Sequence, residues 1–133
     1  MQAKFVYESI KDILRSKSEE DIMDSIIKKM EERNLSPNQL LIQSSNVGFL
    51  PGVKKALEMG ANVHTLDDSP LRLASENGHT NVVEILLKNH ADIHANNDWP
   101  LRWASASADN HLDVVKLLLK YGANAHAQDV MLQ

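Results

Sequence analysis

Cysteine is absent from this chain of 133 residues. Disulfide bridges and thiolate metal sites are therefore excluded, and the composition suits a reducing, intracellular setting. Long apolar runs are absent as well, and none approaches the ~20 residues that a membrane-spanning helix needs. Because the first residues, MQAKFVYESIKDILR, interleave charges with apolar side chains, they do not form a signal peptide. We expect no membrane partner.

No strong excess of charge marks the sequence either. The formal net charge is −4, and it is spread along the chain without a large asymmetry. Nothing in this distribution recruits nucleic acid electrostatically, so we expect no nucleic-acid partner.

Catalytic motifs are also missing. The sequence has no glycine-rich phosphate loop, no G-x-S-x-G and no H-E-x-x-H. Its carboxylates fall on polar faces as solvated charges, and its serines cap or fill helices. We therefore expect a protein that is not an enzyme and that uses no cofactor.

The sequence does contain an internal repeat. Most of residues 69–94 recurs in residues 99–126. The first part of the match is offset by 30 residues and the later part by 32, so two residues have been added within 106–110. A weaker third copy lies about 30 residues earlier, between Leu41 and His64. Periods of this length indicate stacked supersecondary units, each unable to bury its apolar face alone.

Each unit is predicted to form a helix, a turn, a second helix and an extended finger. Ser69 is placed to cap a first helix that begins at Pro70, where a missing N–H costs nothing. Gly78 is placed to end that helix in a left-handed conformation. A second helix follows from Asn81 with apolar residues at spacings of three and four. It ends at His90, where the other two copies have glycine, so we expect His90 to be left-handed.

Two segments give the repeat a family resemblance. SPLRLASENGH and WPLRWAS resemble the ankyrin signature T-P-L-H-x-A, and VVEILLKNHADIHA and VVKLLLKYGANAHA resemble its second helix and the residues that follow. The resemblance implies an all-α ankyrin-repeat solenoid. It divides the chain into an N-terminal helical cap, residues 1–35, and a repeat domain with a short tail, residues 36–133. The three repeats span about 36–66, 67–96 and 97–129.

The fingers depart from the usual ankyrin unit. Pro70 follows His64 by six positions, and Pro100 follows His94 by six again, which is about three fewer than usual. We expect shortened fingers. The ~30-residue period resembles that of ankyrin proteins encoded by large DNA viruses of amoebae, which would place the protein in the cytoplasm of a host cell.

Two helices are predicted before the repeats. Val6, Ile10, Ile13 and Leu14 form one apolar stripe, and a second helix should start after Ser18. This pair has no ankyrin signature. It is either a cap on the first repeat or a separate docking element for a partner.

The histidines suggest a metal site, but their spacing argues against one. His64, His94 and His126 occupy equivalent places in repeats stacked about 10 Å apart, too far for two imidazoles to share one zinc. We expect no metal site and a structural role at the finger base. His79 and His111 follow the turn between helices, where the family uses histidine to hold the loop.

The resemblance implies a protein partner, bound in the concave groove formed by the first helices and the fingers. The groove candidates in this sequence are Thr65, Leu66, Asp67, Arg72, Ser75, Glu76, Asn96, Asn97, Asp98, Trp99, Arg102, Ser105 and Ala106. Arg72 and Arg102 replace the signature histidine, and they either bind carboxylates of a partner or lie along their neighbours. Trp99 is either a contact residue or packs on Trp103, which we expect in the core.

The last repeat leaves an open end. Only seven residues follow His126, so the first helix of a further repeat cannot form, and Val114, Leu117 and Leu118 stand at the edge of the array. Either this edge is partly exposed or something covers it. The alternative function is therefore a structural or assembly element that self-associates through its uncapped C-terminal repeat, or a chain truncated within a longer array.

Overall fold

The computed structural model describes residues 18–106 and 111–124. Every regular element in these two ranges is an α-helix, as the sequence predicts. The helices are α2 (Glu19–Arg33), α3 (Pro37–Val47), α4 (Leu50–Glu58), α5 (Thr65–Glu76), α6 (Thr80–Lys88), α7 (Ala95–Ala106) and α8 (Leu112–Lys120). The helix predicted around Val6 to Leu14, the two-residue insertion after Ala106 and His126 lie outside the described residues.

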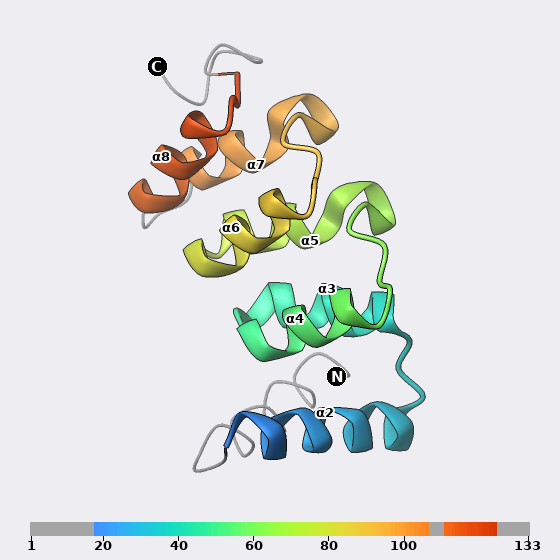
Figure 1. Cartoon of the computed structure of the whole chain (residues 1–133). Coiled ribbons are helices and arrows are strands. Elements are labelled where there is room, and N and C mark those ends of the chain that lie inside the picture. Colours follow the sequence, from blue (N-terminus) through green and yellow to red (C-terminus); the bar gives the residue numbers. More distant parts are fainter. Residues whose placement is uncertain (1–17, 107–110, 125–133) are drawn as a thin grey trace.

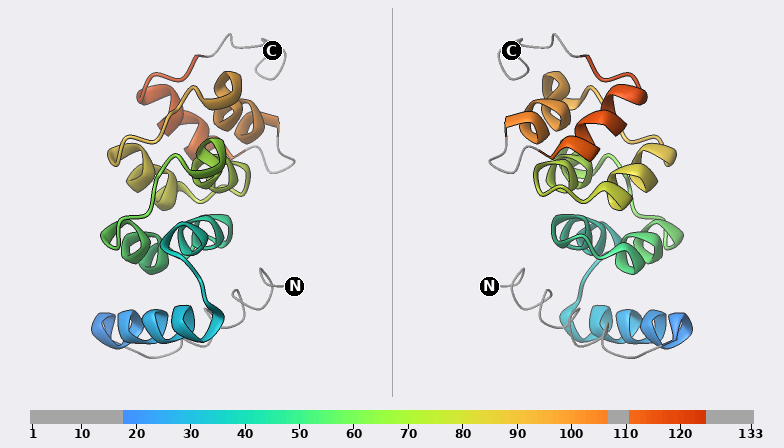
Figure 2. Two further views of the ribbon diagram at one scale, coloured as in Figure 1. Left: turned by 90° about the vertical axis from the view of Figure 1, so that its right-hand side faces the viewer. Right: turned by 90° about the vertical axis from the view of Figure 1, so that its left-hand side faces the viewer.

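The helices after α2 form three stacked hairpins (Figure 1). The pairs α3/α4, α5/α6 and α7/α8 lie one above another, and the side views place α3, α5 and α7 in one column and α4, α6 and α8 in the other (Figure 2). We call these the inner and outer helices. The predicted repeat solenoid is confirmed.

Equivalent leucines of successive hairpins fill one continuous core. Leu41, Leu71 and Leu101 of the inner helices are completely buried, and so are Leu86 and Leu118 of the outer helices. Burying a leucine side chain contributes about 1.5–3 kcal/mol. No hairpin buries these residues by itself, because the inner and outer helices of each hairpin pack on those of a neighbouring hairpin.

Glycine and histidine join the hairpins at the ends of α3 and α5. Gly48 and Gly78 are left-handed there, with φ of 79° and 74°. The His79 ring fills the space where a side chain on Gly48 would lie, and His111 does the same beside Gly78. His79 Nε2 also lies 3.0 Å from the carbonyl oxygen of Asn46 in the preceding repeat. The predicted loop-holding role of His79 is thereby confirmed.

The fingers are reduced to a single left-handed turn. Leu66, Asp67 and Asp68 have φ between 50° and 58° in one repeat, and residues 96–98 repeat this conformation in the next. Left-handed residues with a Cβ atom cost about 1–2 kcal/mol each. The last residue of each turn, Asp68 or Asp98, is buried and makes the hydrogen bonds that hold the turn.

These two aspartates connect successive turns of the stack. Asp68 lies 3.0 Å from Nδ1 of His64 and accepts the backbone N–H of Asp92 at 2.7 Å. Asp98 likewise lies 3.0 Å from Nδ1 of His94 and accepts the N–H of Asn124 at 2.6 Å. The expected structural role at the finger base is therefore correct for His64 and His94.

Asp98 was expected in the binding groove, and that expectation is wrong. Its carboxylate makes hydrogen bonds inside the fold, and only 4% of the residue is exposed. Ser75 was also expected in the groove, and that expectation is wrong because Ser75 is fully buried on the side of α5 that faces the core. The cap predicted at Ser69 is also wrong, since its buried hydroxyl has no hydrogen-bond partner among the described residues.

The start of α2 and its end agree with the sequence. Ser18 accepts the N–H of Asp21 at 3.2 Å, and Asn34 ends the helix in a left-handed conformation with φ of 56°. Ile26 and Met30 of α2 are buried, and the helix packs against α4 of the first hairpin. The open apolar end of that hairpin is thus covered on this side.

At the other end of the stack, the apolar residues that are exposed on and just after α8 are not those that the sequence predicts. Val114 and Leu118 were expected at an open edge but are almost completely buried, because α8 packs on α6 and α7. The residues left exposed are instead Leu112, Leu119 and Tyr121, at 54%, 42% and 38%. Leu87 stands at the position equivalent to Leu119 in the preceding repeat and is only 8% exposed.

His90→Gly should stabilise the protein. His90 is exposed and left-handed, with φ of 71°, as the sequence predicts, whereas Gly60 and Gly122 occupy the equivalent positions. Removing this strain should raise the free energy of unfolding by about 0.5–1 kcal/mol, measured by thermal and urea denaturation. Asn89→Gly is the control: Asn89 is right-handed and donates to the carbonyl of Ile85 at 2.8 Å, so its loss should lower stability. An unchanged or lower melting temperature for His90→Gly would contradict the account.

Candidate functional site

Two tryptophans and two charged residues meet on the inner helices. We call Arg72 and Glu76 of α5 and Trp99 and Trp103 of α7 the inner-face cluster. The two indole rings lie 5.2 Å apart between centroids and are tilted by 32°. The guanidinium carbon of Arg72 lies 5.4 Å from the centre of the Trp99 ring, and the Trp99 Nε1–H donates to Glu76 at 3.3 Å. Side chains from two repeats therefore form one surface.

Of the alternatives for Trp99, the structure shows the packing on Trp103. Its ring packs on Trp103, is half-buried, and has a hydrogen-bond partner for its N–H. Aromatic pairs of this kind contribute about 0.5–1.5 kcal/mol beyond the area they bury. Trp99 is thus held in place by its neighbours, and it supports the more exposed ring of Trp103.

Trp103 was expected in the core, and that expectation is wrong. The residue is 37% exposed, although Leu101 and Ala104 beside it are completely buried. Trp103 follows Trp99 by four residues, so both rings lie on the same face of α7 and stack there. A sequence comparison with Leu73, which is half-buried, could not distinguish this arrangement from core packing.

The two arginines differ in what they contact. Arg72 lies over Trp99 and donates from Nη2 to the carbonyl oxygen of Leu66 at 3.3 Å, so it lies along its neighbours. Arg102 is half-buried, and no contact of its guanidinium with a ring or a carbonyl is seen among the described residues. The Nε atoms of both arginines are buried without a hydrogen-bond partner in the part of the chain that the structure describes.

The remaining candidates surround the cluster unevenly. Asn96 and Asn97 are exposed in the left-handed turn before α7, and Leu66 is 70% exposed in the equivalent turn before α5. Ser105 donates its hydroxyl to the carbonyl of Leu101 at 2.8 Å, so it is occupied within its own helix. The inner surface therefore combines exposed turns, an aromatic stack and arginines.

The described residues offer little for other chemistry. They contain no group of three or more His, Asp, Glu or Cys side chains that could hold a metal ion. None of their helices is long and apolar enough to cross a membrane.

A stack of inner and outer helices, repeated three times and joined by short turns, defines an α-solenoid. The family model for ankyrin repeats, in three copies, matches residues 40–129. The chain belongs to the ankyrin-repeat family. A search of curated proteins gave no match. Ankyrin repeats are in general protein–protein interaction modules and are typically not enzymes.

Trp103→Leu should leave the fold intact and change the fluorescence. Trp99 and Trp103 are the two tryptophans of the chain, so their emission reports on the inner-face cluster alone. Because Trp103 is 37% exposed and leucine stands at the equivalent position 73, the free energy of unfolding should fall only by about 0.5–1.5 kcal/mol, the contribution of the lost ring pair. The remaining half-buried Trp99 should be quenched less by acrylamide than the wild-type pair. A loss above about 2 kcal/mol would instead place Trp103 in the core.

Proposed function

We propose that the protein is a non-catalytic adaptor that binds a protein partner through the inner-face cluster and the left-handed turns beside it. The observation that carries the proposal is the exposed Trp103, stacked on Trp99, over which Arg72 of the preceding repeat lies. Tryptophan and arginine dominate the binding energy of protein interfaces, especially when their geometry is fixed before binding. Of the residues expected in the groove, Arg72, Glu76, Asn96, Asn97, Trp99 and Arg102 belong to this surface.

The proposal includes the position of the protein in the cell and the division of the chain. The absence of cysteine supports an intracellular adaptor, and the short period supports a viral one acting in host cytoplasm. We further propose that the segment before residue 36 caps the array. The burial of Ile26 and Met30 where α2 packs on α4 supports this role over that of a free docking element.

A second candidate function is assembly through the last repeat. Leu112, Leu119 and Tyr121 form an exposed apolar group on and just after α8. This group occupies the end of the stack, where a further hairpin or a second copy of the chain would pack. Self-association through this end remains the alternative to the adaptor.

A matched pair of variants separates the two functions. Trp103→Ser and Leu119→Ser each replace a partly exposed apolar side chain, 37% and 42% exposed, with the same small polar one. The partner is first captured from native host cells with the wild-type protein and identified, and its affinity is then measured by calorimetry. We expect Trp103→Ser and Arg102→Ala to weaken binding by about tenfold or more and Leu119→Ser to leave it unchanged.

Light scattering of the same variants completes the test. An adaptor should show the same mass for the wild type and for Leu119→Ser. A higher wild-type mass that Leu119→Ser abolishes, together with full partner binding by Trp103→Ser, would overturn the adaptor in favour of assembly.

A further inference from the structure

An apolar hollow lies beside α2, at the end of the stack where that helix packs on α4 (Figure 1). We call it the cap hollow. It has a volume of about 350 Å³, and most of the residues that line it are apolar: Ile27, Met30, Leu35, Pro37 and Met59. Ile27 is half-buried and Met59 is 43% exposed, so part of this apolar surface is open to solvent. A further segment packed here would complete the burial.

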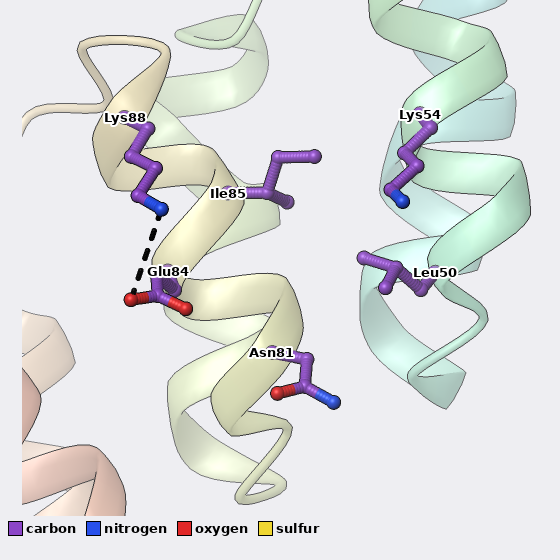
Figure 3. Close-up of a pocket in the computed structure, with 6 residues that line it drawn as sticks. All are labelled: Leu50, Lys54, Asn81, Glu84, Ile85 and Lys88. Atoms are coloured by element: carbon purple, nitrogen blue, oxygen red, sulfur yellow. Dashed lines mark ion pairs between the residues drawn. The ribbon is translucent and has the colours of Figure 1, made fainter.

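The hollow between the outer helices α4 and α6 is different (Figure 3). Its apolar residues Leu50 and Ile85 pack against the core of the stack. Its rim carries the exposed ion pair of Glu84 and Lys88, whose charged atoms lie 3.9 Å apart. This hollow therefore offers no comparable apolar wall to an occupant.

Helix α2 presents an apolar row and an acidic row on the side of the cap hollow. Residues three, four or seven positions apart lie on one side of a helix. Met23 and Ile27 form the apolar row and are half-buried. Glu20, Asp24 and Glu31 form the acidic row beside it. All three are exposed, and no ion pair joins them to another of the described residues. The acidic row favours a basic occupant.

The chain itself contains an apolar stripe that matches α2. Residues 1–17 lie outside the described residues and directly precede the cap residue Ser18. The stripe of their predicted helix, Val6, Ile10, Ile13 and Leu14, stands 12, 8, 5 and 4 positions before Ser18. Met30, Ile26, Met23 and Ile22 stand 12, 8, 5 and 4 positions after it. Two antiparallel helices that rise equally from one turn bring residues at equal distances from the turn together. The two stripes are therefore in register for a helical hairpin.

The charges fit the same register. Residues 1–17 hold four basic and two acidic side chains, so the segment is basic where α2 is acidic. Lys4, Lys11 and Arg15 follow one another at spacings of seven and four residues. Glu31, Asp24 and Glu20 have the same spacings in the reverse direction along the chain. An antiparallel pair therefore places each basic residue opposite an acidic one, at the edge of the apolar contact.

We propose that residues 1–17 fold back on α2 as an antiparallel helix. Its apolar stripe packs along Met23 and Ile27, Val6 enters the cap hollow, and the basic row pairs with the acidic row of α2. The inference rests on the proposed cap and deepens it, and it does not involve the inner-face cluster. It assigns the open side of α2 to the chain's own first residues, so that side is not a docking site for a partner.

Amide hydrogen exchange on the full chain measures this contact. A synthetic peptide of residues 1–17 is the reference, because an isolated helix of that length is marginal in water. The amides of residues 6–14 should exchange at least about tenfold more slowly in the full chain than in the peptide. Ile27→Ser should remove most of this protection and leave that of α6 unchanged. The control is Ile85→Ser, which alters a half-buried isoleucine of α6 and should not affect residues 6–14.

A charge swap tests the register. Asp24→Lys places a second lysine opposite Lys11 and should lower the protection of residues 6–14 by about threefold or more. Adding Lys11→Asp to this variant should restore the protection, which a general loss of stability would not allow. Asp113→Lys is the matched control, because Asp113 is exposed on α8 and its replacement gives the same change of charge. It should leave the protection unchanged.

Three outcomes would overturn the inference. The first is that residues 6–14 exchange as fast as the peptide. If α2 stays protected in that case, the proposed cap survives without the folded-back helix, whereas free exchange of α2 would refute the cap as well. The second is a charge swap that restores no protection. The third is a dimer, detected by light scattering, that Ile27→Ser dissociates, because a second copy of the chain would then occupy the open side of α2.

Discussion

The structure depends on the fact that one helical hairpin of this sequence cannot cover its own apolar residues. Leu41, Leu71 and Leu101 become inaccessible to water because each belongs to a hairpin that packs on a neighbouring hairpin. Burial must exceed the conformational entropy that each ordered residue loses, and it does so only through neighbours. Helix α2 supplies such a neighbour at one end of the stack, through Ile26 and Met30.

The short turns set the spacing of the stack and limit where binding can occur. A finger of three left-handed residues is too short to form an extended arm, and its last residue is needed as an acceptor for the backbone of the next turn. The hydrogen bonds to Asp68 and Asp98 therefore fix one turn on the next. Recognition is left to the faces of the helices, where Trp103 is exposed.

The sequence predicted whatever depends on short spacings or on the repetition itself. The three repeats and the left-handed conformation of His90 follow from comparing the copies, and the helix start at Ser18 follows from residues within one turn of each other. The errors concern contacts between distant residues. Asp98 looks like any polar turn residue until its partner 26 residues later is known. Trp103 has the register of a core residue, but its ring lies against that of Trp99 and is 37% exposed.

Amide hydrogen exchange in Leu86→Ala tests the dependence of each hairpin on its neighbours most directly. Leu86 is completely buried in the second repeat, and truncating it should cost about 2–5 kcal/mol. If the hairpins stabilise one another, the amides of α4 and α8 should lose protection together with those of α6. Protection lost in α6 alone, with α4 and α8 unchanged from the wild type, would contradict a single continuous core.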